Sequence, residues 1–127
     1  MKIAFPCFDE NGMRAWVCDH FGCAPWFTIF DSISRECAVF SNGDQYLDEN
    51  GKCNPQAALR GHKIDAVVCR GLGRRALLSL HEMGIDVYKI EAGEVAEAIA
   101  EFEHGKATKM TAADVKACPN HPNCDMA

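Results

Sequence analysis

The chain has 127 residues, a length that suits one domain able to bury about two thirds of the surface that its unfolded chain exposes. Hydrophobic residues make up 48% and charged residues 24%, which excludes a disordered or fibrous protein. The net charge of -5 argues against a nucleic-acid binder, because phosphate neutralisation needs clustered lysines and arginines.

The first half of the chain predicts three strands. Residues 2–8 form an apolar run, and residues 26–31 show the alternation of a second strand. Residues 35–41 follow after a short link, which is typical of an antiparallel hairpin. Cys37 lies within this third strand, and we expect it to pack in the core.

The second half predicts strands that alternate with helices. We expect a short helix over residues 54–61, a buried strand over 65–69, a helix that opens at 71–73 and ends before Gly84, and a fifth strand over 86–90. In a third helix, Val95, Ile99 and Phe102 share one face, and Gly105 follows them as a stop. The pattern indicates an α/β domain over residues 1–110 with helices on both faces of the sheet, and a tail over residues 111–127.

Eight cysteines are many for this length, and in a secreted chain they would indicate disulfides. The apolar run near the N-terminus is far too short for a signal peptide, and no stretch reaches the length of a membrane span. We therefore expect a cytoplasmic protein with no membrane partner, whose cysteines are thiols or metal ligands.

Two groups of residues have the composition of metal sites. Cys18, His20 and Cys23 place two thiols and an imidazole within a short segment, although two buried cysteines beside a surface histidine explain the spacing equally well. In the tail, three further candidates stand at three-residue spacing on a proline-rich stretch: Cys118, His121 and Cys124. A structural zinc site needs four ligands, so this tail would need one more thiol from elsewhere, with Cys53 and Cys23 as candidates.

A third group is suited to an anion. The stretch from Arg70 through Gly71, Gly73, Arg74 and Arg75 leads from a buried strand into a helix. Ligands of open α/β sheets bind beyond the carboxyl ends of parallel strands, where glycines and a helix N-terminus favour negative charge. A glycine turn with solvated arginines is the simpler alternative.

Other cysteines and aromatic residues have less specific expectations. Cys7 ends the first strand and would lie beside Cys69 if their strands are neighbours. Trp16 and Trp26, like the phenylalanines, are expected in the core or in a pocket wall.

The sequence resembles the dinitrogenase iron-molybdenum cofactor biosynthesis family over roughly residues 1–105. The resemblance lies in Met1-Lys2-Ile3-Ala4-Phe5-Pro6, in His20-Phe21-Gly22-Cys23-Ala24-Pro25-Trp26-Phe27 with Asp31, and in Gly71-Leu72-Gly73-Arg74-Arg75-Ala76. Cys23 stands where many relatives have arginine or another residue, and the pattern of the tail is not part of the common domain.

The resemblance implies a ribonuclease H-like α/β fold with a five-stranded mixed sheet and an antiparallel second strand. It also implies a carrier of a metal-sulfur cluster that contains molybdenum, iron or copper, with a cofactor-biosynthesis or acceptor protein as partner. His20 inherits the role of a cluster contact, together with Phe21 and Gly22 of the same motif.

We therefore expect a non-enzymatic carrier. Its cargo would be held by Arg70, Arg74, Arg75 and the glycine backbone, and its metal by His20 with Cys18 or Cys23. The alternative is a binding module with structural zinc at the tail. A thiol oxidoreductase is disfavoured because the chain has no Cys-x-x-Cys pair, and a nuclease because no carboxylate set is evident.

Overall fold

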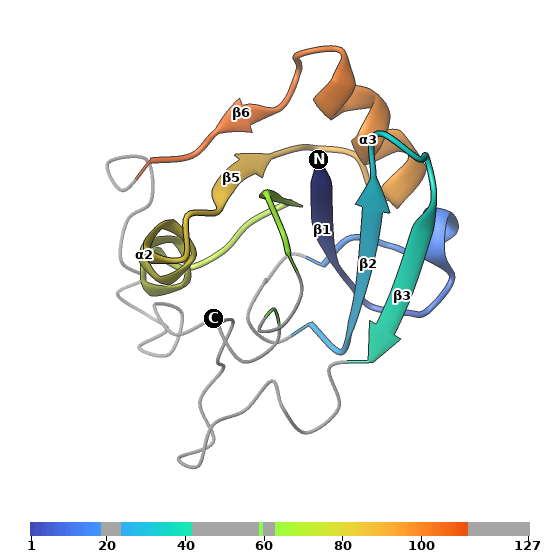
Figure 1. Cartoon of the computed structure of the whole chain (residues 1–127), viewed down its shortest axis with the longest axis horizontal. Coiled ribbons are helices and arrows are strands. Elements are labelled where there is room, and N and C mark those ends of the chain that lie inside the picture. Colours follow the sequence, from blue (N-terminus) through green and yellow to red (C-terminus); the bar gives the residue numbers. More distant parts are fainter. Residues whose placement is uncertain (19–23, 42–58, 60–62, 112–127) are drawn as a thin grey trace.

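The computed structural model describes residues 1–18, 24–41, 59 and 63–111. They form a six-stranded mixed sheet in the order β3-β2-β1-β4-β5-β6, with two α-helices and one 3-10 turn (Figure 1). The strands are β1 (Lys2–Cys7), β2 (Trp26–Asp31), β3 (Cys37–Ser41), β4 (Ala66–Cys69), β5 (Asp86–Lys89) and β6 (Thr108–Lys109). The helical elements are η1 (Gly12–Arg14), α2 (Arg74–Glu82) and α3 (Val95–Glu103).

The central strands β1, β4 and β5 are parallel, and antiparallel strands complete both sides of the sheet. The predicted antiparallel hairpin is confirmed, since β2 pairs with both β1 and β3 in that sense. The predicted helix over residues 54–61 lies outside the described residues except for Leu59. Among the described residues, no helix is long and apolar enough to cross a membrane.

The predicted number of five strands is wrong. The sixth strand, β6, pairs antiparallel with β5, with Thr108 opposite Lys89 and Lys109 opposite Tyr88. It has only two residues, both exposed, so it leaves no hydrophobic alternation in the sequence. The ribonuclease H-like assignment stays a prediction.

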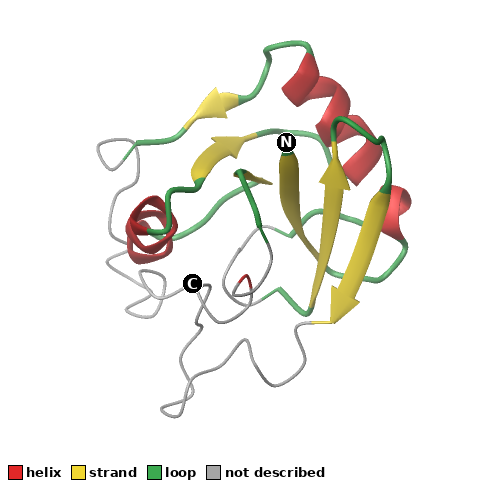
Figure 2. Cartoon of the chain, viewed as in Figure 1, coloured by secondary structure: helices red, strands yellow, loops and turns green. Residues whose placement is uncertain are grey.

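The predicted helices on both faces of the sheet are confirmed, because α2 and α3 contribute to two separate cores that lie against the sheet. Figure 2 shows these helices and the strands of the sheet. The α2-side core joins Ala4 of β1 with Ala76, Leu77 and Leu80 of α2. The α3-side core joins Ile3 and Phe5 of the same strand with Val95, Ala98 and Ile99 of α3. Alternation along β1 therefore sends successive side chains into different cores.

The two long helices begin and end where the sequence predicts. Gly84 follows α2 with a φ of +77°, a left-handed conformation that favours glycine at a helix end. Gly105 follows α3 in the same way with a φ of +74°. Val95 and Ile99 of α3 are buried, and Phe102 packs against the same core, as their spacing predicts.

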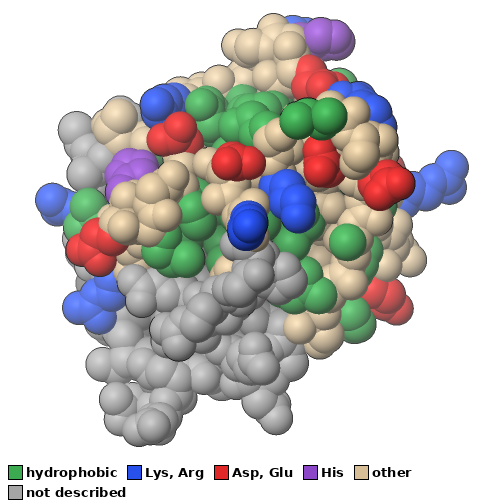
Figure 3. Space-filling view, in the orientation of Figure 1, with side chains coloured by type: hydrophobic (Ala, Val, Ile, Leu, Met, Phe, Trp, Pro, Cys, Tyr) green, Lys and Arg blue, Asp and Glu red, His purple; other side chains and the backbone are tan. Residues whose placement is uncertain are grey.

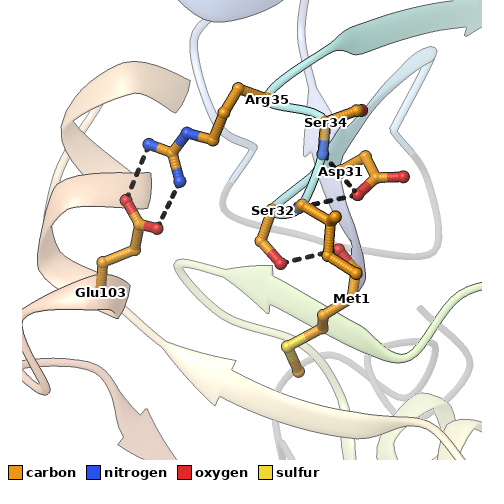
Figure 4. A network of polar contacts seen from close by, with 7 residues as sticks. Met1, Asp31, Ser32, Ser34, Arg35 and Glu103 are labelled. Atoms are coloured by element: carbon orange, nitrogen blue, oxygen red, sulfur yellow. Dashed lines mark hydrogen bonds and ion pairs between the residues drawn. The ribbon is translucent and has the colours of Figure 1, made fainter.

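The turn between β2 and β3 is fixed by local polar contacts (Figure 4). The carboxylate of Asp31 accepts hydrogen bonds from the backbone N–H groups of Ile33 and Ser34. Arg35 has a φ of +64°, and its guanidinium pairs with Glu103 at the end of α3. The turn is thereby attached to the helix that covers one face of the sheet.

Charges of both signs are mixed on the face of the molecule that Figure 3 shows. The described lysine and arginine side chains on this face lie among aspartates and glutamates, with hydrophobic side chains between them. Phosphate-backbone binding draws its affinity from clustered cations, so this mixed arrangement of the described side chains does not favour it.

The prediction that Cys37 packs in the core is wrong, because its side chain is exposed. Cys37 is the first residue of β3, which is an outer strand of the described sheet. An edge strand has a neighbouring strand on one side only. The position of Cys37 in the middle of the predicted strand therefore does not ensure that its side chain is buried.

Candidate functional site

The parallel strands β1, β4 and β5 end at one edge of the sheet, at Cys7, Cys69 and Lys89. Open α/β sheets bind ligands beyond this carboxyl edge, because the loops and helix N-termini that come after the strands gather there. The candidate site is therefore built from the segments that leave these three strand ends.

The segment over residues 15–18 crosses the end of β1 and lies between β1 and the loop that precedes α3. Val17 pairs antiparallel with Cys7, and the N–H of Cys18 donates to the carbonyl of Pro6 at 2.7 Å. On the other side, the N–H of Val17 donates to the carbonyl of Gly93 at 2.7 Å. These bonds fix Cys18 at the carboxyl edge, where its side chain is only 3% exposed.

The predicted glycine loop opens α2 at the same edge. Gly73 is the N-cap, with φ of -77° and ψ of 161°, and it has no side chain to cap the N–H groups of the first helical turn. Arg74 and Arg75 begin the helix, are exposed, and form no ion pair with the described residues. An uncapped helix start that carries two arginines is suited to an anion.

The loop and the segment around Cys18 meet in the α2-side core. This core contains Cys18 and Ala24, the two described residues that flank residues 19–23. It also contains Leu72 of the loop and Ala76 in the first turn of α2. The described residues on either side of residues 19–23 thus belong to the core that supports the glycine loop.

The predicted neighbourhood of Cys7 and Cys69 is correct for the strands but not for the side chains. Their strands are adjacent, parallel and end at one edge, with Ala4 opposite Val67. Cys69 lies in the α2-side core, whereas Cys7 lies in the α3-side core. The sheet itself therefore separates the two thiols.

Burial keeps both thiols protonated near neutral pH. Burial raises the pKa of Cys69 to about 12, although a hydrogen bond from the Gly71 backbone opposes the change. Burial likewise raises the pKa of Cys7 to about 11, against a hydrogen bond with Thr28. Neither thiol is a ready metal ligand in this state, because metals bind the thiolate.

Several predicted site residues lie outside the described residues: His20, Phe21, Gly22, Cys23, Cys53, Cys118, His121 and Cys124. Within the described ranges, no group of three or more His, Cys, Asp or Glu side chains could hold a metal ion. Both predicted metal sites stay predictions, and so does the boundary between domain and tail.

The expectation that Trp16 and the phenylalanines lie in the core is wrong for Phe8 and Trp16, an exposed aromatic pair at this edge, and their place in a pocket wall stays a prediction. Phe8 is 53% exposed and Trp16 is 47% exposed. Both stand beside a polar stretch of sequence, residues 9–14, which is the signal in the sequence that they do not belong to a core element.

Known structures have the same fold. The apo form of the orange protein from Desulfovibrio gigas matches with a TM-score of 0.76 and 23% identity, over 87% of this chain and 92% of that one. A Thermotoga protein described as NifB matches with a TM-score of 0.74 and 24% identity, over 93% and 97%. A Methanocaldococcus jannaschii protein described as a dinitrogenase matches with a TM-score of 0.64 and 18% identity, over 87% and 95%.

No curated protein matches the sequence. A sequence profile described as dinitrogenase iron-molybdenum cofactor matches residues 1–105, which include the glycine loop and both flanks of residues 19–23. The match covers most of the chain. The chain therefore belongs to the dinitrogenase iron-molybdenum cofactor family.

Proposed function

We propose that this protein binds and carries a metal-sulfur cluster as cargo, at the carboxyl edge of its sheet, and is not an enzyme. The observation that carries the proposal is the uncapped, arginine-bearing start of α2, which shares a core with Cys18 and Ala24. The chain belongs to the dinitrogenase iron-molybdenum cofactor family, and this membership supports a metal-sulfur cluster as the class of cargo.

The first part of the site would hold negative charge. A sulfide-bridged cluster is a bulky anion, and the first N–H groups of α2 point along the helix axis toward such a ligand. Arg74 and Arg75 add two exposed cations, and Arg70 lies at the end of β4 just before the loop. Any residue could adopt the backbone conformation of Gly73, so glycine is not required there for its φ. What glycine provides is the absence of a side chain, which lets a large anion approach the backbone.

The second part would bind metal. His20 with Cys18 or Cys23 supplies an imidazole and thiols, which are ligands that molybdenum, iron and copper sulfides can accept. Cys18 is held at the carboxyl edge by its hydrogen bond to Pro6 and is 3% exposed, whereas Cys69 is fully buried and protonated. One or two replaceable ligands suit a protein that must release its cargo, whereas four fixed cysteines suit a permanent cluster.

A carrier of this kind needs a donor or an acceptor of the cargo, and we propose a cofactor-biosynthesis or acceptor protein in that role. Structural zinc at the tail is the alternative that the sequence suggests, and no described residue favours it.

The experiment is anaerobic purification followed by metal and acid-labile sulfide analysis. We expect a coloured protein that contains sulfide with molybdenum, iron or copper. A colourless protein with one zinc and no sulfide would refute the carrier and support the zinc module.

A further inference from the structure

The described surface has an aromatic pair that the proposed cargo site does not use. Phe8 follows β1, and its N–H donates to the carbonyl of Trp16 at 2.9 Å. Because Cys7 pairs antiparallel with Val17, Phe8 stands directly opposite Trp16. Side chains of directly opposed residues lie on the same face of a sheet, so the two aromatic rings form one exposed surface.

This surface lies beside the candidate site. In the extended segment over residues 16–18, Trp16 and Cys18 project to the same side, because side chains alternate with period two. Cys18 belongs to the α2-side core. The aromatic pair is therefore on the α2 side of the carboxyl edge, next to the place where the cargo would bind.

The position of the Trp16 indole is built into the fold. A Cβ atom at Gly93 would lie 2.3 Å from the ring of Trp16, so the indole occupies the space that a side chain at Gly93 would need. The carboxylate of Asp9 accepts a hydrogen bond from the N–H of Trp16 and thereby holds the backbone of the same residue. About half of the side chain nevertheless remains exposed. A half-exposed tryptophan that is held in place is typical of the anchor of an interface.

The border of the pair is acidic. Asp9, whose carboxylate accepts the hydrogen bond from the N–H of Trp16, and Glu10 follow Phe8 directly in the chain, and the one cation of residues 8–16 is Arg14. Glu94 stands directly opposite Trp16 in an isolated antiparallel β-bridge. An apolar centre with an acidic border complements a protein surface that has an apolar side chain among lysines or arginines.

We propose that Phe8 and Trp16, bordered by Glu10 and Glu94, form a docking surface for a basic, apolar-centred surface of a partner protein. Its position beside the cargo site makes that partner the donor or acceptor of the cargo, a role that rests on the proposed function. Docking here would bring the partner to the edge at which the cargo is held.

The test uses a short synthetic peptide with a central Leu-Phe pair between lysine-rich flanks, and a counterpart in which glutamate replaces every lysine. Titrations are followed by NMR at the amides of Phe8 and Glu94 and at the indole N–H of Trp16. The basic peptide should bind at least about tenfold more tightly than the acidic one and shift these signals.

Variants test the assignment of the surface. Trp16→Ser should weaken basic-peptide binding about tenfold, and Gly93→Ala should weaken it with Trp16 still present, because the new Cβ displaces the indole. Glu10→Lys with Glu94→Gln should also weaken the binding of the basic peptide, because it removes negative charge from the border of the surface. Two controls should bind as wild type: Ile33→Ser, which removes a residue that is 83% exposed outside the surface, and Glu36→Lys with Glu82→Gln, which makes the same change of charge elsewhere.

Equal affinity for the two peptides would overturn the docking surface, as would unchanged binding in Trp16→Ser or an equal loss in Ile33→Ser. Each variant is also titrated with tetrathiomolybdate, a sulfide-ligated molybdenum anion, whose binding should not change in Trp16→Ser. If the wild type binds the peptide but no tetrathiomolybdate, the docking surface stands and the proposed cargo is wrong. If it binds tetrathiomolybdate alone, the cargo site stands and the docking surface is wrong.

Discussion

The guanidinium of Arg35 donates two hydrogen bonds to the carboxylate of Glu103, from Nη1 to Oε2 at 2.6 Å and from Nη2 to Oε1 at 3.1 Å (Figure 4). The same guanidinium lies 4.9 Å from the centre of the Phe30 ring. The contact joins the β2–β3 turn to the last turn of α3. Both partners are exposed, so the contribution to stability is small and screened by salt.

The hydrogen bond from Arg35 lowers the pKa of Glu103 from its ordinary value of 4.5. A lowered folded-state pKa stabilises the fold above the ordinary value, and this stabilisation is lost as the pH falls through the folded-state value. Glu103→Gln should therefore lower Tm slightly at neutral pH, by an amount that shrinks toward zero below pH 4.5. Thermal unfolding against pH measures this, with Glu82→Gln as a control that should follow the wild type. A constant difference across the pH range would contradict the assignment.

The thiols should differ sharply in reactivity. For Cys7, a pKa of about 11 in place of 9.0 leaves about a hundredfold less thiolate near neutral pH, and burial slows its reaction further. Cys69, with a pKa of about 12, should react more slowly still, and of these three described thiols exposed Cys37 should be alkylated first. Mass spectrometry of iodoacetamide-treated protein gives the order, and unfolding in urea should remove it. Alkylation of Cys69 as fast as Cys37 in the folded protein would contradict the burial.

The same pKa values predict a loss of stability at alkaline pH. Well below pH 9.0 both thiols are protonated in the folded and the unfolded state, so their titration does not make the stability depend on pH. Above it, the unfolded chain loses protons that the folded chain keeps, so stability should fall as the pH rises from 9.0 toward 11 and 12. Urea unfolding across this range measures the slope. A free energy of unfolding that rises there would contradict the prediction.

His20 should act on cargo more than on folding. We expect His20→Ala to reduce retention of tetrathiomolybdate and copper while Tm changes little, because a metal contact contributes to binding and a packing residue to stability. The assay is gel filtration with metal analysis, and His81→Ala, on α2 and exposed, is the control. Normal retention in His20→Ala would show that the residue is not a ligand.

The tail should respond to metal. Fixing its backbone costs on the order of 1 to 2 kcal/mol per residue, and ligation through Cys118, His121 and Cys124 is able to offset this cost. Metal should therefore slow amide exchange across residues 111–127, and Cys118→Ser with Cys124→Ser should remove the effect. Equal exchange with and without metal would rule out a metal-closed tail.

The sequence predicts the fold well where hydrophobic alternation is long. The hairpin of β2 and β3 and the two helices that end before Gly84 and Gly105 follow directly from periodicity and from glycine. Strand β6 could not be predicted, because two exposed residues carry no period. The expectation for Cys37 is wrong because burial depends on the position of its strand in the sheet, which pairing decides and local sequence does not.

The site was only partly predictable for the same reason. The glycine loop and its arginines are recognisable because they follow a buried strand directly in sequence. That Cys7 and Cys69 face different cores depends on the register of β1 against β4, a single-residue shift of which would reverse it. The contact of Trp16 with Gly93 joins positions far apart in the chain and is visible only in space.

The most direct test of the proposed carrier is tetrathiomolybdate affinity in the double variant Arg74→Glu with Arg75→Glu. Acidic residues in the first turn of a helix are favourable, so α2 should persist and Tm should change little. Lys63→Glu with Lys106→Glu makes the same change of charge at exposed positions away from the loop and is the matched control. We predict that affinity falls at least about tenfold in the arginine variant and stays near wild type in the lysine variant. Unchanged affinity in the arginine variant, or an equal loss in both, would contradict an anion site at the start of α2.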